Sequence, residues 1–109
     1  MSQRTEKVKS LLRQRVASEL SQAIGPGSAN ITVTAIDVSP DLKQATVWLG
    51  LLGQPKDQEA LWQSAEAVRP DVQAAVASVM TTKFVPKLVF KRDLSGDYAQ
   101  HIESIIREL

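Results

Sequence analysis

Basic side chains are concentrated near the start of the chain, on a segment whose apolar spacing predicts a helix. They are Arg4, Lys7, Lys9, Arg13 and Arg15. On a helix, these residues flank the apolar stripe on both sides. Contact with phosphate needs only positive charge and reach, so this group is a candidate for binding a nucleic-acid backbone. The alternative is a solvated helix whose lysine and arginine stems cover apolar surface.

A second basic group lies around a predicted strand late in the chain. It consists of Lys83, Lys87, Lys91 and Arg92, and Arg69 adds a cation between two predicted helices. The formal net charge is only +1, so the total charge does not indicate nucleic-acid binding. The clustering of the basic residues does. We take both groups, together with Arg69, as the candidate RNA-binding residues.

Two tryptophans are further candidate contacts. Trp48 falls on the opposite strand face from Val47 and Leu49. We favour packing of Trp48 against a covering helix, and stacking on a nucleic-acid base is the alternative. Trp62 lies off the inner stripe of its predicted helix and is a partly exposed candidate contact.

The sequence offers little for catalysis or metal binding. It has no cysteine and a single histidine, His101. Gly50-Leu-Leu-Gly53 lacks the lysine of a phosphate loop. Asp41 suits a turn and Asp97 a helix start, so an acidic site that includes them is disfavoured. We predict no enzymatic activity, no metal and no cofactor.

No apolar run approaches the length of a membrane span, and no apolar signal-peptide core follows the first residues. We therefore predict a cytoplasmic protein without membrane contact, and we expect a monomer. At 109 residues, the chain predicts one domain that covers residues 1–109.

Hydrophobic periodicity predicts the first elements of this domain. Helical spacing predicts a helix over residues 5–24, and two alternating runs predict a β-hairpin over residues 31–51. Ser39-Pro40-Asp41-Leu42 separates the two runs, with Pro40 suited to the second position of a turn and Asp41 to the third. A phase shift at Ala35–Ile36 predicts a bulge.

Pro70 interrupts a helical pattern over residues 58–80. Inside a helix it would remove a hydrogen bond and clash with the previous turn, at a cost of about 3 kcal/mol. We therefore predict that Pro70 begins a second helix, and that two helices cross at a large angle at Arg69. A third strand over residues 84–93 and a last helix over residues 96–109 complete the domain.

The resulting order, α-β-β-α-α-β-α, predicts an α+β fold with a three-stranded sheet and helices largely on one face. This is the topology of a type II KH-like domain. A KH domain that binds nucleic acid uses a Gly-x-x-Gly loop. No such loop lies between the paired helices, and Asp71 in the first turn of the second helix would repel a phosphate. We therefore favour the basic helix and strand surfaces over the KH groove.

Three local strings, in this order of elements, resemble the bacterial ribosome-binding factor A family over nearly the whole chain. They are Arg15-Val-Ala17 with Glu19 and Leu20; Val38-Ser-Pro-Asp-Leu-Lys43 leading into Ala45-Thr-Val-Trp-Leu49; and Phe84-Val-Pro-Lys-Leu-Val-Phe90 with Asp93 and Ser95. The chain departs from the family pattern in several places, among them a basic segment before Val-Pro that is reduced to Thr81-Thr-Lys83. Val68-Arg69-Pro70 stands where the family has its small-residue-x-Gly bend, and Gln73 stands where it usually has an arginine.

The resemblance implies a non-enzymatic ribosome assembly factor. Such a factor binds the free small ribosomal subunit and its rRNA, and assists late maturation and processing of small-subunit rRNA. The alternative is a KH-like protein-interaction module without direct RNA binding. That alternative predicts little salt dependence and no affinity for rRNA.

Overall fold

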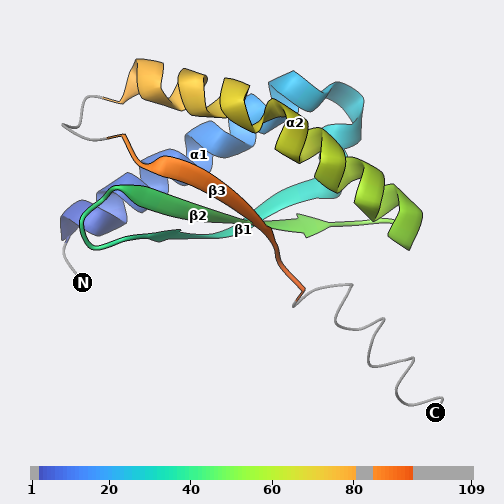
Figure 1. Ribbon diagram of the computed structural model, residues 1–109, viewed down its shortest axis with the longest axis horizontal. Helices are drawn as coiled ribbons and strands as arrows, with labels where there is room; N and C mark the ends of the chain where they lie inside the picture. Colours follow the sequence, from blue (N-terminus) through green and yellow to red (C-terminus); the bar gives the residue numbers. More distant parts are fainter. Residues whose placement is uncertain (1–2, 81–84, 95–109) are drawn as a thin grey trace, which may run out of the picture.

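The computed structural model describes the backbone of residues 3–80 and 85–94, and the side chains of this part from residue 6 onward. The order is α1 (Gln3–Ile24), the 3-10 helix η1 (Gly25–Asn30), β1 (Ile31–Val38), β2 (Gln44–Leu51), α2 (Pro55–Val79) and β3 (Lys87–Arg92). Figure 1 shows both α-helices on the same side of the sheet. The predicted last helix, residues 96–109, and Lys83 lie outside the described residues.

The three strands form one sheet in the order β1-β2-β3. The hairpin pair β1–β2 is antiparallel, as predicted. β3 runs parallel to β2, because α2 carries the chain back across the helix layer before β3 begins. The α+β class, the three-stranded sheet and the one-sided helices are thus confirmed in the described part of the chain.

The hairpin turn has the predicted chemistry. The Leu42 amide donates to the Ser39 carbonyl at 2.9 Å, which places Pro40 and Asp41 at the two central positions. The Asp41 carboxylate accepts hydrogen bonds from the Ser39 hydroxyl at 2.7 Å and from the Lys43 amide at 3.1 Å. These bonds, the one from Ser39 first, hold the pKa of Asp41 below its ordinary value. Leu42 leaves the turn with φ of 61°.

The bulge lies one residue earlier than predicted. The β1–β2 register passes from Val33 opposite Leu49 directly to Ala35 opposite Trp48, so Thr34 is the extra residue. The Thr34 hydroxyl donates to the Trp48 carbonyl at 3.3 Å, and its methyl lies where a β-carbon on Gly50 would come within 3.0 Å. A larger residue at position 50 would therefore collide with the bulge.

The prediction of two helices that meet at Arg69 is wrong. α2 is one helix from Pro55 to Val79, and Pro70 lies inside it. Its axis changes direction near the middle (Figure 1), which is the usual response to an interior proline. Pro70 is on the exposed side, whereas Val72 and Val76 are fully buried beneath it. Burying two such side chains stabilises the helix by roughly 3–6 kcal/mol, which offsets the roughly 3 kcal/mol that proline costs.

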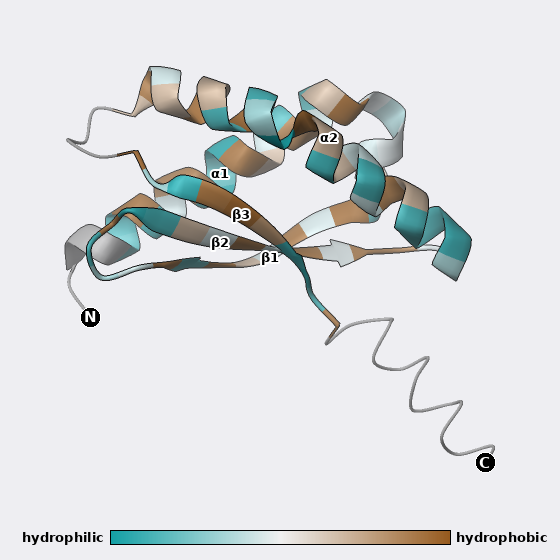
Figure 2. Ribbon diagram, in the orientation of Figure 1, coloured by the Kyte–Doolittle hydropathy of each residue, from teal (hydrophilic) through white to brown (hydrophobic). Residues whose placement is uncertain are grey.

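The core lies between the helices and one face of the sheet. Figure 2 shows brown, apolar residues interspersed with teal ones along both helices, and a brown stretch along β3. The buried members include Leu12 and Val16 on α1, Val47 and Leu49 on β2, and Leu88 on β3. Strand alternation sends the neighbouring residues to the opposite face.

We call that opposite side the open face, because neither helix of the described part covers it. It carries Thr32, Ala35, Asp37, Thr46, Trp48, Gly50, Lys87, Val89 and Lys91. Trp48 is half-buried there and stays outside the core cluster. The favoured interpretation of Trp48, packing against a covering helix, is therefore not met by α1 or α2.

Candidate nucleic-acid interface

The basic group on α1 is spread along the outside of the helix. Lys7 is exposed, Lys9 Nζ lies 3.7 Å from Glu6, and Arg15 lies 3.8 Å from Glu19. Such surface pairs contribute about 0.2–1 kcal/mol each and are screened by salt. A phosphate can therefore compete for these cations at little cost. Arg4 belongs to α1, but its side chain is outside the described part.

Arg13 has a different environment from the rest of the α1 group. Its Nη2 atom donates to the Thr34 carbonyl at 2.6 Å and lies 3.4 Å from the Val33 carbonyl. These two carbonyls belong to the β1 bulge, where the ladder to β2 is interrupted. Arg13 therefore ties α1 to the edge of the sheet, and its first role is structural.

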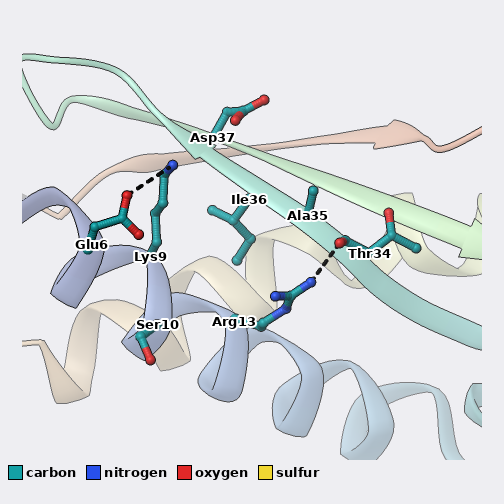
Figure 3. A pocket seen from close by; sticks show the side chains of 8 residues that line it. All are labelled: Glu6, Lys9, Ser10, Arg13, Thr34, Ala35, Ile36 and Asp37. Carbon is teal, nitrogen blue, oxygen red and sulfur yellow. Dashed lines mark hydrogen bonds and ion pairs between the residues drawn. The ribbon is translucent and has the colours of Figure 1, made fainter. Parts of the chain in front are cut away.

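A groove of about 440 Å³ separates the N-terminal half of α1 from β1. Figure 3 shows Glu6, Lys9, Ser10 and Arg13 along its helix side, and residues 34–37 of β1 along the other. The groove contains two cations, Lys9 and Arg13, and two carboxylates, Glu6 and Asp37. Its balanced charge does not favour an isolated anion.

The β3 group is divided between the two faces of the sheet. Lys87 and Lys91 are exposed on the open face. Arg92 lies on the helix side, where its guanidinium pairs with Glu59 and lies 5.1 Å from the Trp62 ring centre. The hydrogen bond from Arg92 holds the pKa of Glu59 below its ordinary value. Arg92 and the half-buried Trp62 thus clamp β3 to α2.

Trp48 forms the centre of the open face. Its indole Nε1 donates to Asp37 at 3.2 Å, and the Lys91 ammonium lies 5.7 Å from its ring centre. The register places Ala35, Trp48 and Lys91 in one row across the three strands. An aromatic ring beside a lysine is a combination that binds unpaired bases in other proteins.

The continuous α2 removes the anion site that a second helix start would have offered. Arg69 is half-buried in the middle of the helix, and Asp71, the residue directly after the proline, is exposed. The backbone donors near Arg69 are therefore interior to a helix, apart from the one that Pro70 lacks.

Gln73 links α2 to β3 through its side-chain amide. Its Nε2 donates to the Pro86 carbonyl at 3.0 Å, and its Oε1 accepts from the Leu88 amide at 2.7 Å. The side-chain amide thus pairs with the outer edge of β3 as a neighbouring strand would. In the sequence, Gln73 stands out only as a departure from the family's arginine. The signal for its part-buried role is its spacing of three residues from Val76, which puts both on the same side of the helix.

The described residues contain no group of three or more His, Cys, Asp or Glu side chains placed to hold a metal ion. Within the same ranges, neither helix combines the length and apolarity that a membrane crossing requires.

The family model for ribosome-binding factor A matches residues 4–106 of the chain. Ribosome-binding factor A of Macrococcus caseolyticus is 33% identical over 110 residues, which cover 100% of this chain and 96% of the relative. The protein of the same name from Citrifermentans bemidjiense is 30% identical over 110 residues, which cover 100% of this chain and 92% of the relative.

Solved structures share the fold. The solution structure of a Thermotoga maritima protein superimposes with a TM-score of 0.73 at 17% identity, over 89% of this chain and 93% of that one. The crystal structure of ribosome-binding factor A from Thermus thermophilus gives a TM-score of 0.68 at 18% identity, over 81% and 93% of the two chains.

A homology model of the Thermus protein, fitted into a cryo-electron microscopy map of a 30S–ribosome-binding factor A complex, gives a TM-score of 0.63 at 19% identity, over 80% and 92% of the two chains. The sequence match covers nearly the full chain, and the fold agrees with it. The chain therefore belongs to the ribosome-binding factor A family.

Proposed function

We propose that this protein binds the free small ribosomal subunit in the cytoplasm and assists late maturation and processing of its rRNA, as a monomer and without catalysis. The observation that carries the proposal is the family match over residues 4–106. The 30S complex of the Thermus homologue, whose fold this chain shares, supports the choice of the small subunit as partner.

Within this proposal, the predicted RNA-binding residues divide into two classes. Lys7, Lys9 and Arg15 on α1, with Lys87 and Lys91 on β3, have side chains at the surface and are the proposed phosphate contacts. Arg13 and Arg92 hold the helix layer to the sheet, so they position these contacts. Arg4, Arg69 and Lys83 remain predicted contacts.

Sedimentation of cell extract tests the partner. We expect the protein to travel with free small subunits and to dissociate from them as salt rises. Cells that lack the protein should accumulate small subunits with unprocessed rRNA ends. Absence from the small-subunit fraction at low salt would contradict the proposal.

Salt dependence tests the mode of contact. Each neutralised phosphate contributes about −0.7 to −0.9 to the slope of log affinity against log salt. Charge removal at Lys7, Lys9 and Arg15 should therefore reduce the magnitude of the slope by roughly 1 per contact. Lys56→Gln, an exposed lysine on α2 outside both basic groups, is the matched control.

The alternative function is a protein-interaction module of the same fold. The structural roles of Arg13 and Arg92 favour it, because they reduce the number of cations available to RNA. This alternative predicts binding to a ribosomal protein with little dependence on salt, and no affinity for protein-free small-subunit rRNA. A filter-binding assay with that rRNA distinguishes the two functions.

A further inference from the structure

The open face of the sheet contains a large aromatic ring that the core does not use. Trp48 lies on the central strand with Ala35 as its neighbour on β1 and Lys91 as its neighbour on β3. Its neighbours along β2 on the same face are Thr46 and Gly50. Small residues thus surround the indole on three sides. An indole that served only to fill space would be expected among larger apolar partners.

The orientation of the ring is fixed by a hydrogen bond. The indole Nε1 donates to the exposed Asp37 carboxylate at 3.2 Å, which restricts rotation of the ring. A ring that is held in place loses little further freedom when a ligand stacks on it. The Asp37 carboxylate accepts this hydrogen bond from the β1 side of the ring.

Positive charge flanks the ring along β3. The Lys91 ammonium lies 5.7 Å from the ring centre, near the limit of a cation–π contact, and Lys87 is exposed on the same face of the same strand. Contact at this distance on an exposed lysine stem is weak. The Lys91 ammonium can therefore leave the ring and bind a phosphate with little loss of interaction energy. On the β1 side, the groove beside Ala35 has balanced charge, so the net positive charge next to the ring is that of β3.

We propose that the open face binds single-stranded RNA, with one unpaired base stacked on Trp48 and the adjoining phosphates on Lys91 and Lys87. Aromatic side chains on a sheet with flanking lysines recognise single strands in this way. A duplex keeps its bases paired and cannot make the stack. This inference rests on the proposed function, and it names unpaired RNA as the part of the partner that this face contacts.

The two tryptophans of the chain allow a direct test. Trp62→Phe keeps a ring beside Arg92 and leaves Trp48 as the single tryptophan of the full-length protein, whose emission is read with excitation that spares the tyrosine. Titration with an oligouridylate of roughly eight nucleotides should quench its emission saturably at low salt. A double-stranded RNA of the same length is the matched ligand control and should leave the emission unchanged.

Substitutions at Trp48 and Lys91 measure how much each side chain contributes to oligouridylate affinity. Trp48→Leu should weaken oligouridylate binding roughly 5- to 150-fold, the range for loss of one stacked base. Trp48→Tyr, which keeps an aromatic ring, should retain most of the affinity, and Lys91→Gln should mainly reduce the salt dependence. If Trp48→Leu fails to fold, as judged by circular dichroism, the quenching titration and the Lys91→Gln variant still decide the question.

Three results would overturn the inference. One is oligouridylate binding, measured by anisotropy, without any quenching of Trp48. Another is a folded Trp48→Leu variant that binds as tightly as the parent. A third is a Trp48 emission that iodide cannot quench in the full chain, which would mean that residues 96–109 or a second copy cover this face. Co-sedimentation of the parent with small subunits is measured in parallel, and only its failure counts against the proposed function.

Discussion

The two edges of the sheet present the same problem and receive different treatment. β1 and β3 are the edge strands of the described sheet, and each has backbone groups that no strand of residues 3–80 and 85–94 pairs. At β1, the cationic Arg13 reaches from α1 to two carbonyls of the bulge, and its contacts are exposed. At β3, the neutral amide of Gln73 reaches from α2 to one carbonyl and one amide, and its contacts are part-buried.

The difference lies in what replaces each contact when it is lost. Water can donate to the bulge carbonyls if Arg13 leaves, so the Arg13 guanidinium can move from these carbonyls to a phosphate. Water reaches the Leu88 amide less easily, so loss of Gln73 leaves a poorly solvated donor. The β3 edge is therefore closed at Pro86 and Leu88 by a neutral amide that water replaces poorly, whereas the β1 bulge is held by an exposed cation. RNA contact is expected at the open face and the surface cations of α1 more than between α2 and β3.

Loss of Gln73 should have the largest effect on stability. Gln73→Leu leaves two part-buried backbone groups unpaired, and we expect the free energy of unfolding to fall by about 2–4 kcal/mol. Urea denaturation measures this change. Gln63→Leu, which removes an exposed amide from the same helix, is the matched control. A loss for Gln73→Leu no greater than that of the control would mean that the β3 edge is as accessible to water as β1.

Restoring an arginine at this position sharpens the same comparison. Gln73→Arg supplies donors but no acceptor for the Leu88 amide, so it should be destabilising. If the surface between α2 and β3 is a latent RNA site, the added charge should still tighten small-subunit binding at low salt. Unchanged binding supports the closed β3 edge, and tighter binding that persists at high salt would contradict it.

Arg13 should have a smaller effect on stability. Arg13→Ala removes exposed hydrogen bonds that water replaces, so we expect a loss of about 0.5–1.5 kcal/mol in the free energy of unfolding. Arg13→Lys separates the two roles, since it keeps the charge and loses the planar fork. If Arg13 also contacts phosphate, Arg13→Lys should recover subunit binding better than it recovers stability. Equal recovery of both would indicate that Arg13 acts only through the fold.

These two edges also mark the limit of inference from the sequence. The hairpin and its turn follow from local patterns, and the structure confirms them. The apolar stripe of α1 is confirmed at Val8, Leu12, Val16 and Leu20, whereas Leu11, which the same spacing assigns to the stripe, is exposed. The prediction that Pro70 separates two helices is wrong because the sequence shows only the free-energy cost of an interior proline. The burial of Val72 and Val76, which offsets that cost, depends on packing against the sheet. Arg13 and Gln73 bind backbone groups 21 and 13 residues away, and no periodicity reports such partners. The open position of Trp48 likewise depends on where α1 and α2 pack.

Loss of the Arg92–Glu59 pair should have the smallest effect on the free energy of unfolding. It tests whether a charged contact at β3 contributes as little to stability as the exposed Arg13 contacts at β1. The hydrogen bond from Arg92 lowers the pKa of Glu59 below 4.5, so the folded state favours the ionised carboxyl. Any stability from this pair is fully present above about pH 4.5 and is lost as pH falls through the depressed pKa. Because Glu59 is exposed, the contribution is modest and salt screens it. We therefore expect the parent to exceed Glu59→Gln slightly in free energy of unfolding near neutral pH, and this difference to shrink in acid and at high salt.

Glu66→Gln, an exposed change on the same helix, controls for net charge. A difference that persists in acid would show that the β3 clamp depends on the packing of Arg92 against Trp62 rather than on charge, and the β1 edge would then be alone in depending on a removable cation.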